Sequence, residues 1–254
     1  MKEHAPVKDL PEYLKAVFQI SRDWTTPELY EFRMWCRGHR CSTWELLPGI
    51  YRPEQTMLNE QSLRWDFQIR AHSFLDATGF VPKTDWDWYF LMQHYGMPTR
   101  LLDWTESPLF ALYFAVRDAS KDNLPEVWLL DPWGLNAAAG LGECLLDCSD
   151  PGLSRYLQPA NEKIDLPGGP IALQPPLHST RIVAQKGAFT VHGSSRAPIE
   201  KITELGDRIA RIPIAPGRAS VIKHELFLAG VSETSVFPEL SSLTLDLLYY
   251  WSGE

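Results

Sequence analysis

The sequence predicts an α+β fold in which helices surround a small, mostly antiparallel sheet. The first observation is that the N-terminal half shows long stretches with the apolar spacing of helices and few strand patterns between them. The second is that short strand patterns and helical patterns are mixed in the C-terminal half. The 254 residues, 44% of them hydrophobic and 22% charged, are sufficient for one domain with a sizeable core.

The first three predicted elements are a helix, a strand and a long helix. Apolar residues at helical spacing predict an amphipathic helix over residues 7–23. Residues 31–37 alternate between polar and apolar, which predicts a strand that Gly38 ends. A long helix is expected over residues 59–77, because a glycine and a proline follow it as helix-ending signals.

The middle of the chain adds two helices and a buried strand. An aromatic-rich helix is expected over residues 85–95. Ser107 as N-cap and Pro108 at the first helical position predict a helix over residues 109–116. This helix is apolar nearly all round, so it should be buried, and residues 126–130 are typical of a buried strand.

The remainder of the chain begins with a segment of different composition. Residues 134–176 are rich in Gly, Pro and Asp, which predicts loops and short pieces that form an insertion or a lid. Strand patterns return at residues 188–192 and 208–214, and two short helices are expected at 218–228 and 238–249.

Composition argues against several classes of protein. The formal net charge of −8 argues against non-specific nucleic-acid binding through overall charge and leaves open a local basic groove. No apolar run approaches the roughly 20 residues of a membrane span, and no signal-peptide core follows the N-terminal charges. Four cysteines are too few for a disulfide scaffold, so a cytoplasmic location without membrane contact is expected.

No metal site is expected either. Cys36 and Cys41 have four residues between them, and Cys144 and Cys148 have three, which together with His39 matches no compact zinc-finger spacing. The sequence also lacks the GxxxxGK[ST], HExxH and GxSxG motifs, which argues against P-loop enzymes, zincins and α/β-hydrolases.

The densest polar segment is residues 93–105, which we expect to form a short connection between two apolar helices. Loops held by rigid packing are where binding residues concentrate. In the alternative interpretation the segment is structural: Arg100 pairs with Asp103, Asp103 caps the next helix, and His94 fills a packing position. The candidates for chemistry are His94, Tyr95, Thr99, Arg100, Asp103 and Thr105.

A second cluster lies where the first strand pattern ends in Arg37-Gly38 and His39-Arg40 follows. An arginine at a strand end suits a phosphate or a carboxylate, and a glycine lets a ligand approach the backbone closely. The alternative is a solvated turn that carries surface charge.

Together the two clusters resemble the FRG domain family, which is named after an early Phe-Arg-Gly motif. Here this motif reads Cys36-Arg37-Gly38, with cysteine in the aromatic position. The central hallmark is a stronger match and reads QHYGMPTRLLDWTESP over residues 93–108. The resemblance spans residues of about 30–245. Other residues that fit the family are Leu47, Pro48, Arg52, Arg181, Gln185, Gly187, Phe189 and Gly230.

The resemblance also implies a domain organisation and a biological setting. Residues 30–254 would form the FRG domain, with the loop-rich insertion at about 134–176, and residues 1–29 a helical extension. Because such domains occur in bacterial and phage-related proteins, the resemblance implies a bacterial protein and an effector role in defence against phage.

A weaker similarity, at the level of fold, is to ADP-ribosyltransferases. The Arg-Gly strand end, the polar segment before an Ala-x-x-Phe-Ala helix and a late Gln-x-Gly strand are similar to their three-part site. This similarity implies NAD as a substrate, with its pyrophosphate held by Arg37 or Arg100 and its nicotinamide read by backbone groups beside Gly38. Tyr95 or a tryptophan would stack on the nicotinamide ring.

Departure of nicotinamide leaves an oxocarbenium-like ribose, which a nearby carboxylate stabilises. The transferases take this carboxylate from a late strand, where the present chain offers Gln185, so Asp103 is the best substitute and Glu225 a poorer one. The predicted catalytic residues are Arg37, His94, Arg100, Asp103 and Thr105, and the predicted cofactor-binding residues are Arg37, Gly38, His39, Tyr95, Thr99 and Gln185.

Three hypotheses follow for the function. The first is an enzyme that cleaves NAD or transfers ADP-ribose to a protein or nucleic-acid acceptor. The second is a non-catalytic module that binds a nucleotide or the end of a nucleic acid. The third is that the central motif is structural. Ten tryptophans are compatible with a large core or with an aromatic interface, so the oligomeric state stays open.

Overall fold

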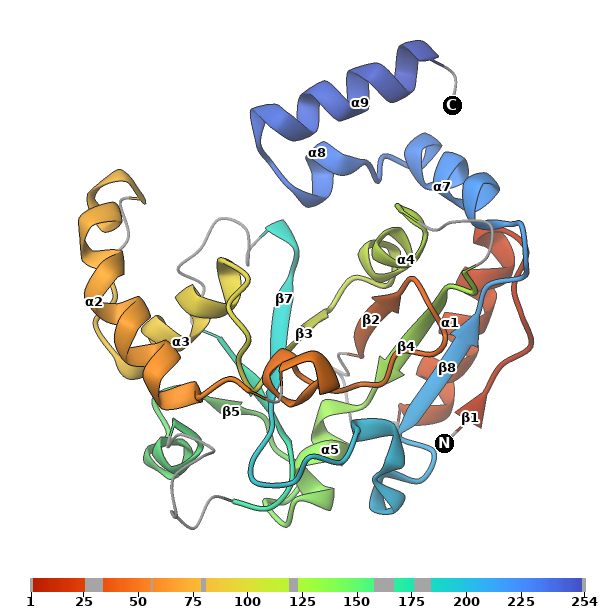
Figure 1. The fold of residues 1–254 in the computed structure, drawn as a ribbon. Coiled ribbons are helices and arrows are strands. Elements are labelled where there is room, and N and C mark those ends of the chain that lie inside the picture. Colours follow the sequence, from red (N-terminus) through yellow and green to blue (C-terminus); the bar gives the residue numbers. More distant parts are fainter. Residues whose placement is uncertain are drawn as a thin grey trace.

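The strands form one mixed sheet that runs through the molecule with helices on both faces (Figure 1). Within the described residues the strand order is β1-β8-β4-β2-β3-β7-β6-β5. The pairings are antiparallel except at the two edges, where β1 pairs with β8 and β5 with β6 in parallel. The predicted α+β class and the mostly antiparallel pairing are therefore confirmed, and the sheet is larger than the small one predicted.

The bounds of the elements come from a computed structural model of the chain. It describes residues 2–25, 34–55, 57–78, 81–118, 123–157, 167–175 and 184–252. The strands are β1 Lys2–Glu3, β2 Trp35–His39, β3 Leu101–Thr105, β4 Glu126–Leu130, β5 Leu146–Asp147, β6 Ile171–Gln174, β7 Gly187–Val191 and β8 Ile209–Pro213. The α-helices are α1 Leu10–Trp24, α2 Glu60–Thr78, α3 Asp85–His94, α4 Pro108–Val116, α5 Pro132–Ala138, α7 Ala219–Leu228, α8 Glu233–Val236 and α9 Leu240–Ser252. Short 3₁₀ helices lie at Gly49–Tyr51, Pro53–Gln55, Pro151–Leu157, Ile199–Lys201 and Thr203–Leu205.

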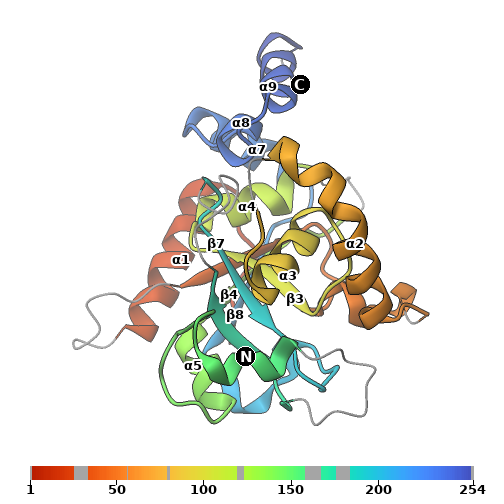
Figure 2. The ribbon, with the colours of Figure 1, turned by 90° about the vertical axis from the view of Figure 1, so that its left-hand side faces the viewer.

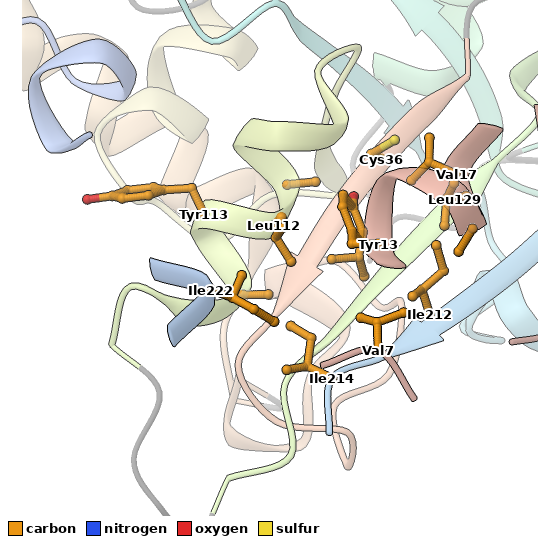
Figure 3. Packing of buried hydrophobic residues seen from close by; sticks show 14 of the residues in the cluster. Val7, Tyr13, Val17, Cys36, Leu112, Tyr113, Leu129, Ile212, Ile214 and Ile222 are labelled. Carbon is orange, nitrogen blue, oxygen red and sulfur yellow. The ribbon is translucent and has the colours of Figure 1, made fainter. Parts of the chain in front are cut away.

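Helices α1, α4 and α7 pack on one face of the β2-β4-β8 part of the sheet (Figure 3). Tyr13 of α1, Leu112 of α4 and Ile222 of α7 are buried in one cluster with apolar residues of the strands. Among these strand residues are Cys36 and Leu129. Helix α1, which lies in the predicted N-terminal extension, therefore shares its core with the rest of the sheet.

Helix α3 packs on the other half of the sheet. Its Trp86 and Phe90 lie in a cluster with Leu101 of β3 and Phe189 of β7. Residues 101, 103 and 105 point to the same side of β3 because side chains alternate along a strand. Since Thr105 is paired with Cys36, this is the same face that α4 covers on β2.

The opposite face is filled by tryptophans and by α5. Trp35, Trp104 and Trp128 are buried there in one cluster with Leu135 of α5. This cluster accounts for part of the high tryptophan content, because these three indoles occupy neighbouring strands.

Most helices and strands lie close to the positions that local sequence signals predict. The Ser107 side chain accepts a hydrogen bond from the Phe110 backbone N–H at 3.4 Å, so it caps α4 as predicted. Helix α4 is buried along most of its length, and β4 has the predicted bounds. Part of the first predicted strand, residues 31–33, lies outside the described residues, as do Gly79 and Arg181.

The main error of prediction concerns residues 101–105, which form β3 in the middle of the sheet and not a connection between helices. Four of these five residues are buried and only Asp103 is exposed. A strand buried on both faces lacks the alternation by which strands are predicted. Consequently the central motif spans the end of α3, a short loop and this strand.

One further prediction was wrong. Gly38 does not end β2, which continues to His39 paired with Glu126. The described part of the region 134–176 consists of loops and short pieces, namely the end of α5, β5, a 3₁₀ helix and β6, and its role as an insertion or lid stays a prediction. The short helix α8 was also not predicted.

A buried ion pair connects α2 to the sheet. The Arg100 Nε donates to the Glu60 carboxylate at 3.0 Å, and both side chains are at most 2% exposed. The Tyr89 hydroxyl donates to the same carboxylate at 2.6 Å, and Arg100 Nη1 donates to the His192 carbonyl at 2.9 Å. Buried charges are tolerated only when paired and hydrogen-bonded, so this cluster fixes α2 and α3 against β3 and β7.

Replacement of Arg100 by methionine should lower the free energy of unfolding by about 3–5 kcal/mol, because it leaves the Glu60 carboxylate buried without its cation. Denaturant unfolding of the full chain measures this. The control is Arg70→Met, which removes an exposed pair with Asp66 within α2 and should change stability by less than about 1 kcal/mol. Equal midpoints for the two variants would show that the buried pair contributes nothing.

Candidate functional site

The face of β3 that carries Asp103 and Thr105 forms the floor of a cavity between α3 and α4. The cavity holds about 470 Å³, within the range of small-molecule sites. Its walls come from the end of α3, from α4 and the residues after it, and from the turn after β2. The lining residues are Cys36, Arg37, Gly38, Arg40, Trp44, Phe90, Gln93, His94, Gly96, Asp103, Trp104, Thr105, Phe114, Arg117, Asp118, Gln185, Gly187 and Phe189.

The cavity lies where two neighbouring strands part. β2 pairs with β4 along its whole length, but with β3 only at Cys36 opposite Thr105. Beyond this pair the Arg37 guanidinium bridges the strands, since its Nη1 donates to the Asp103 backbone carbonyl at 2.5 Å. The same nitrogen lies 3.9 Å from the Asp103 carboxylate. A side chain thus replaces the missing backbone pairing and carries positive charge into the cavity.

Arg37 is oriented by a neutral histidine. Its Nε donates to His39 Nε2 at 3.2 Å, so the ring must accept there and carry its proton on Nδ1. Burial, together with the charges of Arg37 and Arg52, lowers the pKa of His39 to about 3, which keeps the ring uncharged at neutral pH. Nδ1 faces the Glu126 carboxylate at 3.9 Å. Burial lowers the pKa of Arg37 to about 10, so the guanidinium stays cationic at neutral pH.

The Asp103 carboxylate is oriented by a chain of three hydrogen bonds, in which the backbone N–H at one end fixes the donor and acceptor of each following bond. The Leu101 backbone N–H donates to Thr99 Oγ1 at 3.0 Å, and the Thr99 hydroxyl donates to Gln93 Oε1 at 2.5 Å. Because Gln93 Oε1 accepts from Thr99, its amide group faces Asp103 and donates to Oδ2 at 2.7 Å. The carboxylate is still 55% exposed, so a ligand in the cavity can reach it.

Gly38 has a packing role that the sequence did not predict. A Cβ atom at this position would lie 2.1 Å from the Ala111 carbonyl oxygen and 2.6 Å from the Ala115 nitrogen. The glycine therefore lets the α4 backbone approach β2, and a contact between its backbone and a ligand stays a prediction. Gly38 still contributes to the cavity wall.

Thr105, Gln185 and His94 also line the cavity. The Thr105 hydroxyl donates to the Gln185 carbonyl at 2.6 Å and accepts from the Ser107 backbone N–H at 3.0 Å. Its hydrogen bonds therefore join the end of β3 to the segment before β7. The His94 ring packs edge-to-face on Tyr95 with centroids 4.9 Å apart.

Four predicted site residues lie outside the lining set. His39 is buried behind Arg37 and acts on the cavity through that guanidinium. Arg100 is buried in the ion pair with Glu60, and Thr99 acts on the cavity only through Gln93. Tyr95 is 57% exposed and is not a lining residue.

The structure adds residues that sequence reasoning did not select. Arg117 and Asp118 directly follow α4, and Asp118 pairs with Arg117 at 3.3 Å and with Arg40 at 3.4 Å. Arg40 lies over the Trp44 ring at 5.3 Å. Gln93 belongs to the central motif and could have been selected for its amide, whereas no local pattern distinguishes Arg117 and Asp118.

A family model of the FRG domain matches residues 33–124. The match runs from just before β2 through α4 and includes both sequence clusters. The chain contains an FRG domain. Comparisons with curated proteins and with solved structures found no match.

The matched range contains most of the cavity. Arg37, Gln93, Asp103 and Arg117 all lie within it, whereas β7 closes the floor from outside it. Among the described residues, no group of three or more His, Cys, Asp or Glu side chains is placed to hold a metal ion. None of the described helices is both long and apolar enough to cross a membrane.

Replacement of Gly38 by alanine should destabilise the FRG domain by about 3 kcal/mol or more, because the new methyl group meets backbone atoms that cannot turn away. Thermal and denaturant unfolding measure the effect. Gly168→Ala is the matched control, since a Cβ there meets open space, and it should stay within about 0.5 kcal/mol of wild type. A stable Gly38→Ala protein would contradict the close α4–β2 contact.

Proposed function

We propose that the FRG domain binds NAD in the cavity and cleaves the bond between nicotinamide and ribose, with water or an acceptor taking the ADP-ribose. The observation that carries this proposal is the juxtaposition of the Arg37 guanidinium and the exposed Asp103 carboxylate on the cavity floor. A cation for phosphate and a carboxylate for a developing positive charge are the two groups this reaction needs.

Arg37 is suited to hold the pyrophosphate. It is anchored by His39 and by the Asp103 carbonyl, which fixes its orientation before a ligand arrives. Anchored guanidinium groups bind phosphate in a defined geometry at little further cost in entropy. Arg40 and Arg117 add positive charge at the rim, although Asp118 balances part of it.

Asp103 is suited to stabilise the transition state. When the bond from ribose C1′ to nicotinamide nitrogen breaks, the electron pair leaves with nicotinamide and positive charge develops on the ribose. A preoriented carboxylate lowers the energy of this state. The nucleophile then adds to C1′ and loses its proton, for which His94 on the cavity wall is the candidate base.

The aromatic walls provide surfaces for the rings of a dinucleotide. Trp44, Phe114 and Phe189 line the cavity on different sides. Trp44 is 45% exposed, so its face is accessible for stacking. It replaces Tyr95 as the stacking candidate. Depletion of NAD or modification of a protein or nucleic-acid acceptor would suit the effector role in phage defence that the family resemblance implies.

A second candidate function is nucleotide binding without turnover. The specific observation in its favour is that the Asp103 carboxylate already has Gln93 and Arg37 as partners, which reduces its charge toward a ligand. In addition, the segment before β7 offers Gln185 where a transferase would carry glutamate.

Incubation of the full chain with NAD, followed by chromatography of free nicotinamide, tests the proposal. Asp103→Asn keeps the shape and removes the charge, so it should lower the rate of release about 100-fold or more. Arg37→Ala should raise KM, because it removes the pyrophosphate contact. Asp66→Asn on α2 is the control and should match wild type.

The outcomes separate the two functions. Binding of NAD, seen as a raised melting temperature, without nicotinamide release in the presence of cell extract would support the binding module instead. Wild-type rates in Asp103→Asn would remove the carboxylate from the mechanism.

The hydrogen-bond chain behind Asp103 gives a separate prediction. Thr99→Val retains the shape of the side chain but removes the hydroxyl that orients Gln93, so kcat for nicotinamide release should fall about tenfold with little change in KM. Thr99→Ser retains the hydroxyl and should restore the wild-type rate. Equal rates in the valine and serine variants would contradict an orienting role.

A further inference from the structure

Helix α9 presents an apolar face that the FRG-domain cavity does not use. The helix lies at one end of the molecule, beyond α7 and α8, in both orientations (Figures 1 and 2). Seven large apolar side chains on it are between 43% and 84% exposed. One of them, Leu245, lines a smaller pocket together with Asp246 and Tyr249 on the side of α7 and α8. The other six are Leu240, Leu243, Leu247, Leu248, Tyr250 and Trp251.

These six side chains form one continuous stripe. Leu240, Leu243, Leu247 and Tyr250 follow the spacing of three and four residues that produces a pairing seam on a helix. At about 100° per residue Trp251 and Leu248 both lie on one side of this seam, which they widen. The stripe therefore has the pattern of a helix that pairs with another helix.

The other side of α9 is used within the chain. The Asp246 carboxylate accepts hydrogen bonds from the Ser232 hydroxyl at 2.6 Å and from the Thr234 backbone N–H at 2.9 Å, which caps α8. Tyr249 packs on Phe227 of α7 with ring centroids 5.0 Å apart. These contacts fix the rotation of α9 and turn the stripe away from α7 and α8.

Charge distinguishes between the possible partners. Within α9 the only charged residue is Asp246, which belongs to the inner side. A helix that lies on a lipid surface carries Lys or Arg on its polar face, and α9 has neither. A net charge of −8 also opposes binding to an anionic lipid surface. An uncharged apolar stripe is complementary to a copy of itself, because no like charges meet across the seam.

The size of the stripe fits a self-association interface. Aromatic side chains bury about 150–250 Å² each and leucines somewhat less, so the exposed fractions leave an apolar surface on the order of 700 Å². A standard interface buries about 800 Å² per partner, whereas the largest apolar patch of a typical monomer covers roughly 300–600 Å².

We propose that two copies of this chain pair through the outer stripe of α9, related by a two-fold axis that sets the same side chains of each copy against one another. The hydrophobic effect drives the association, with Leu243 and Leu247 at its centre. The proposal is independent of the cavity and of NAD.

Sedimentation velocity of the full chain over the micromolar range tests the pairing. Wild type should sediment as a dimer, and the double variant Leu243→Glu/Leu247→Glu as a monomer that still unfolds cooperatively, because the two side chains are 43% and 50% exposed. Since the dimer stabilises the folded wild type, of these two only wild type should show a melting temperature that rises with concentration. Ile69→Glu is the matched control: Ile69 is 53% exposed on α2, and this variant should remain dimeric. If the double variant fails to fold, Leu240→Glu serves in its place, since Leu240 is 84% exposed.

Three results would overturn the proposal. The first is a wild-type chain that stays monomeric throughout this range. The second is a dimer that persists in the α9 variants. The third is a monomer that co-sediments with zwitterionic lipid vesicles, which would identify α9 as a membrane-surface helix.

Discussion

The architecture of the site depends on how little of β2 pairs with β3. One pair of residues, Cys36 and Thr105, joins these strands, although each pairs fully with its other neighbour. On one side of the opening α4 lies against β2 at Gly38, and on the other α3 packs on β3 and β7. The result is a cavity in the middle of the sheet. The backbone N–H and C=O groups at its edge are not paired with a neighbouring strand and need other hydrogen-bond partners.

Side chains supply those partners and thereby become functional groups. Arg37 satisfies the Asp103 carbonyl, and Gln93 satisfies the Asp103 carboxylate from the opposite wall. Each is held in turn by a residue behind it, His39 for the guanidinium and Thr99 for the amide. Polar groups positioned in this way are preorganised, which is the property that both tight phosphate binding and electrostatic catalysis require.

The C-terminal helices are attached to the wall of the same cavity. Arg117, a lining residue, pairs with Glu233 of α8 at 2.8 Å, and the Gln185 side chain donates to the Val236 carbonyl at 3.2 Å. Asp246 of α9 then caps α8. A dimer formed through α9 would therefore restrain α8, which contacts Arg117 and Gln185 in the cavity wall. Dimer formation and ligand binding would thus both depend on the position of α8.

The sequence by itself determined what depends on neighbours in the chain. Apolar spacing and capping residues placed α1 and α4. The central motif located Asp103, and the separate cluster at the strand end located Arg37. The tertiary structure alone decided what depends on distant partners. It assigned Arg100 to a buried pair with Glu60, forty positions earlier, and brought Arg117 and Asp118 to the cavity.

Strand β3 shows the physical reason for this division. All of its residues except Asp103 are buried, so they have no regular alternation that a pattern could detect, and only the pairing with β2 and β7 makes them a strand. Gly38 shows the same division. The dipeptide Arg37-Gly38 indicates that another group lies close to the backbone, but only the tertiary packing identifies that group as the backbone of α4. Local chemistry restricts which conformations a segment can adopt, and burial against distant segments selects among them.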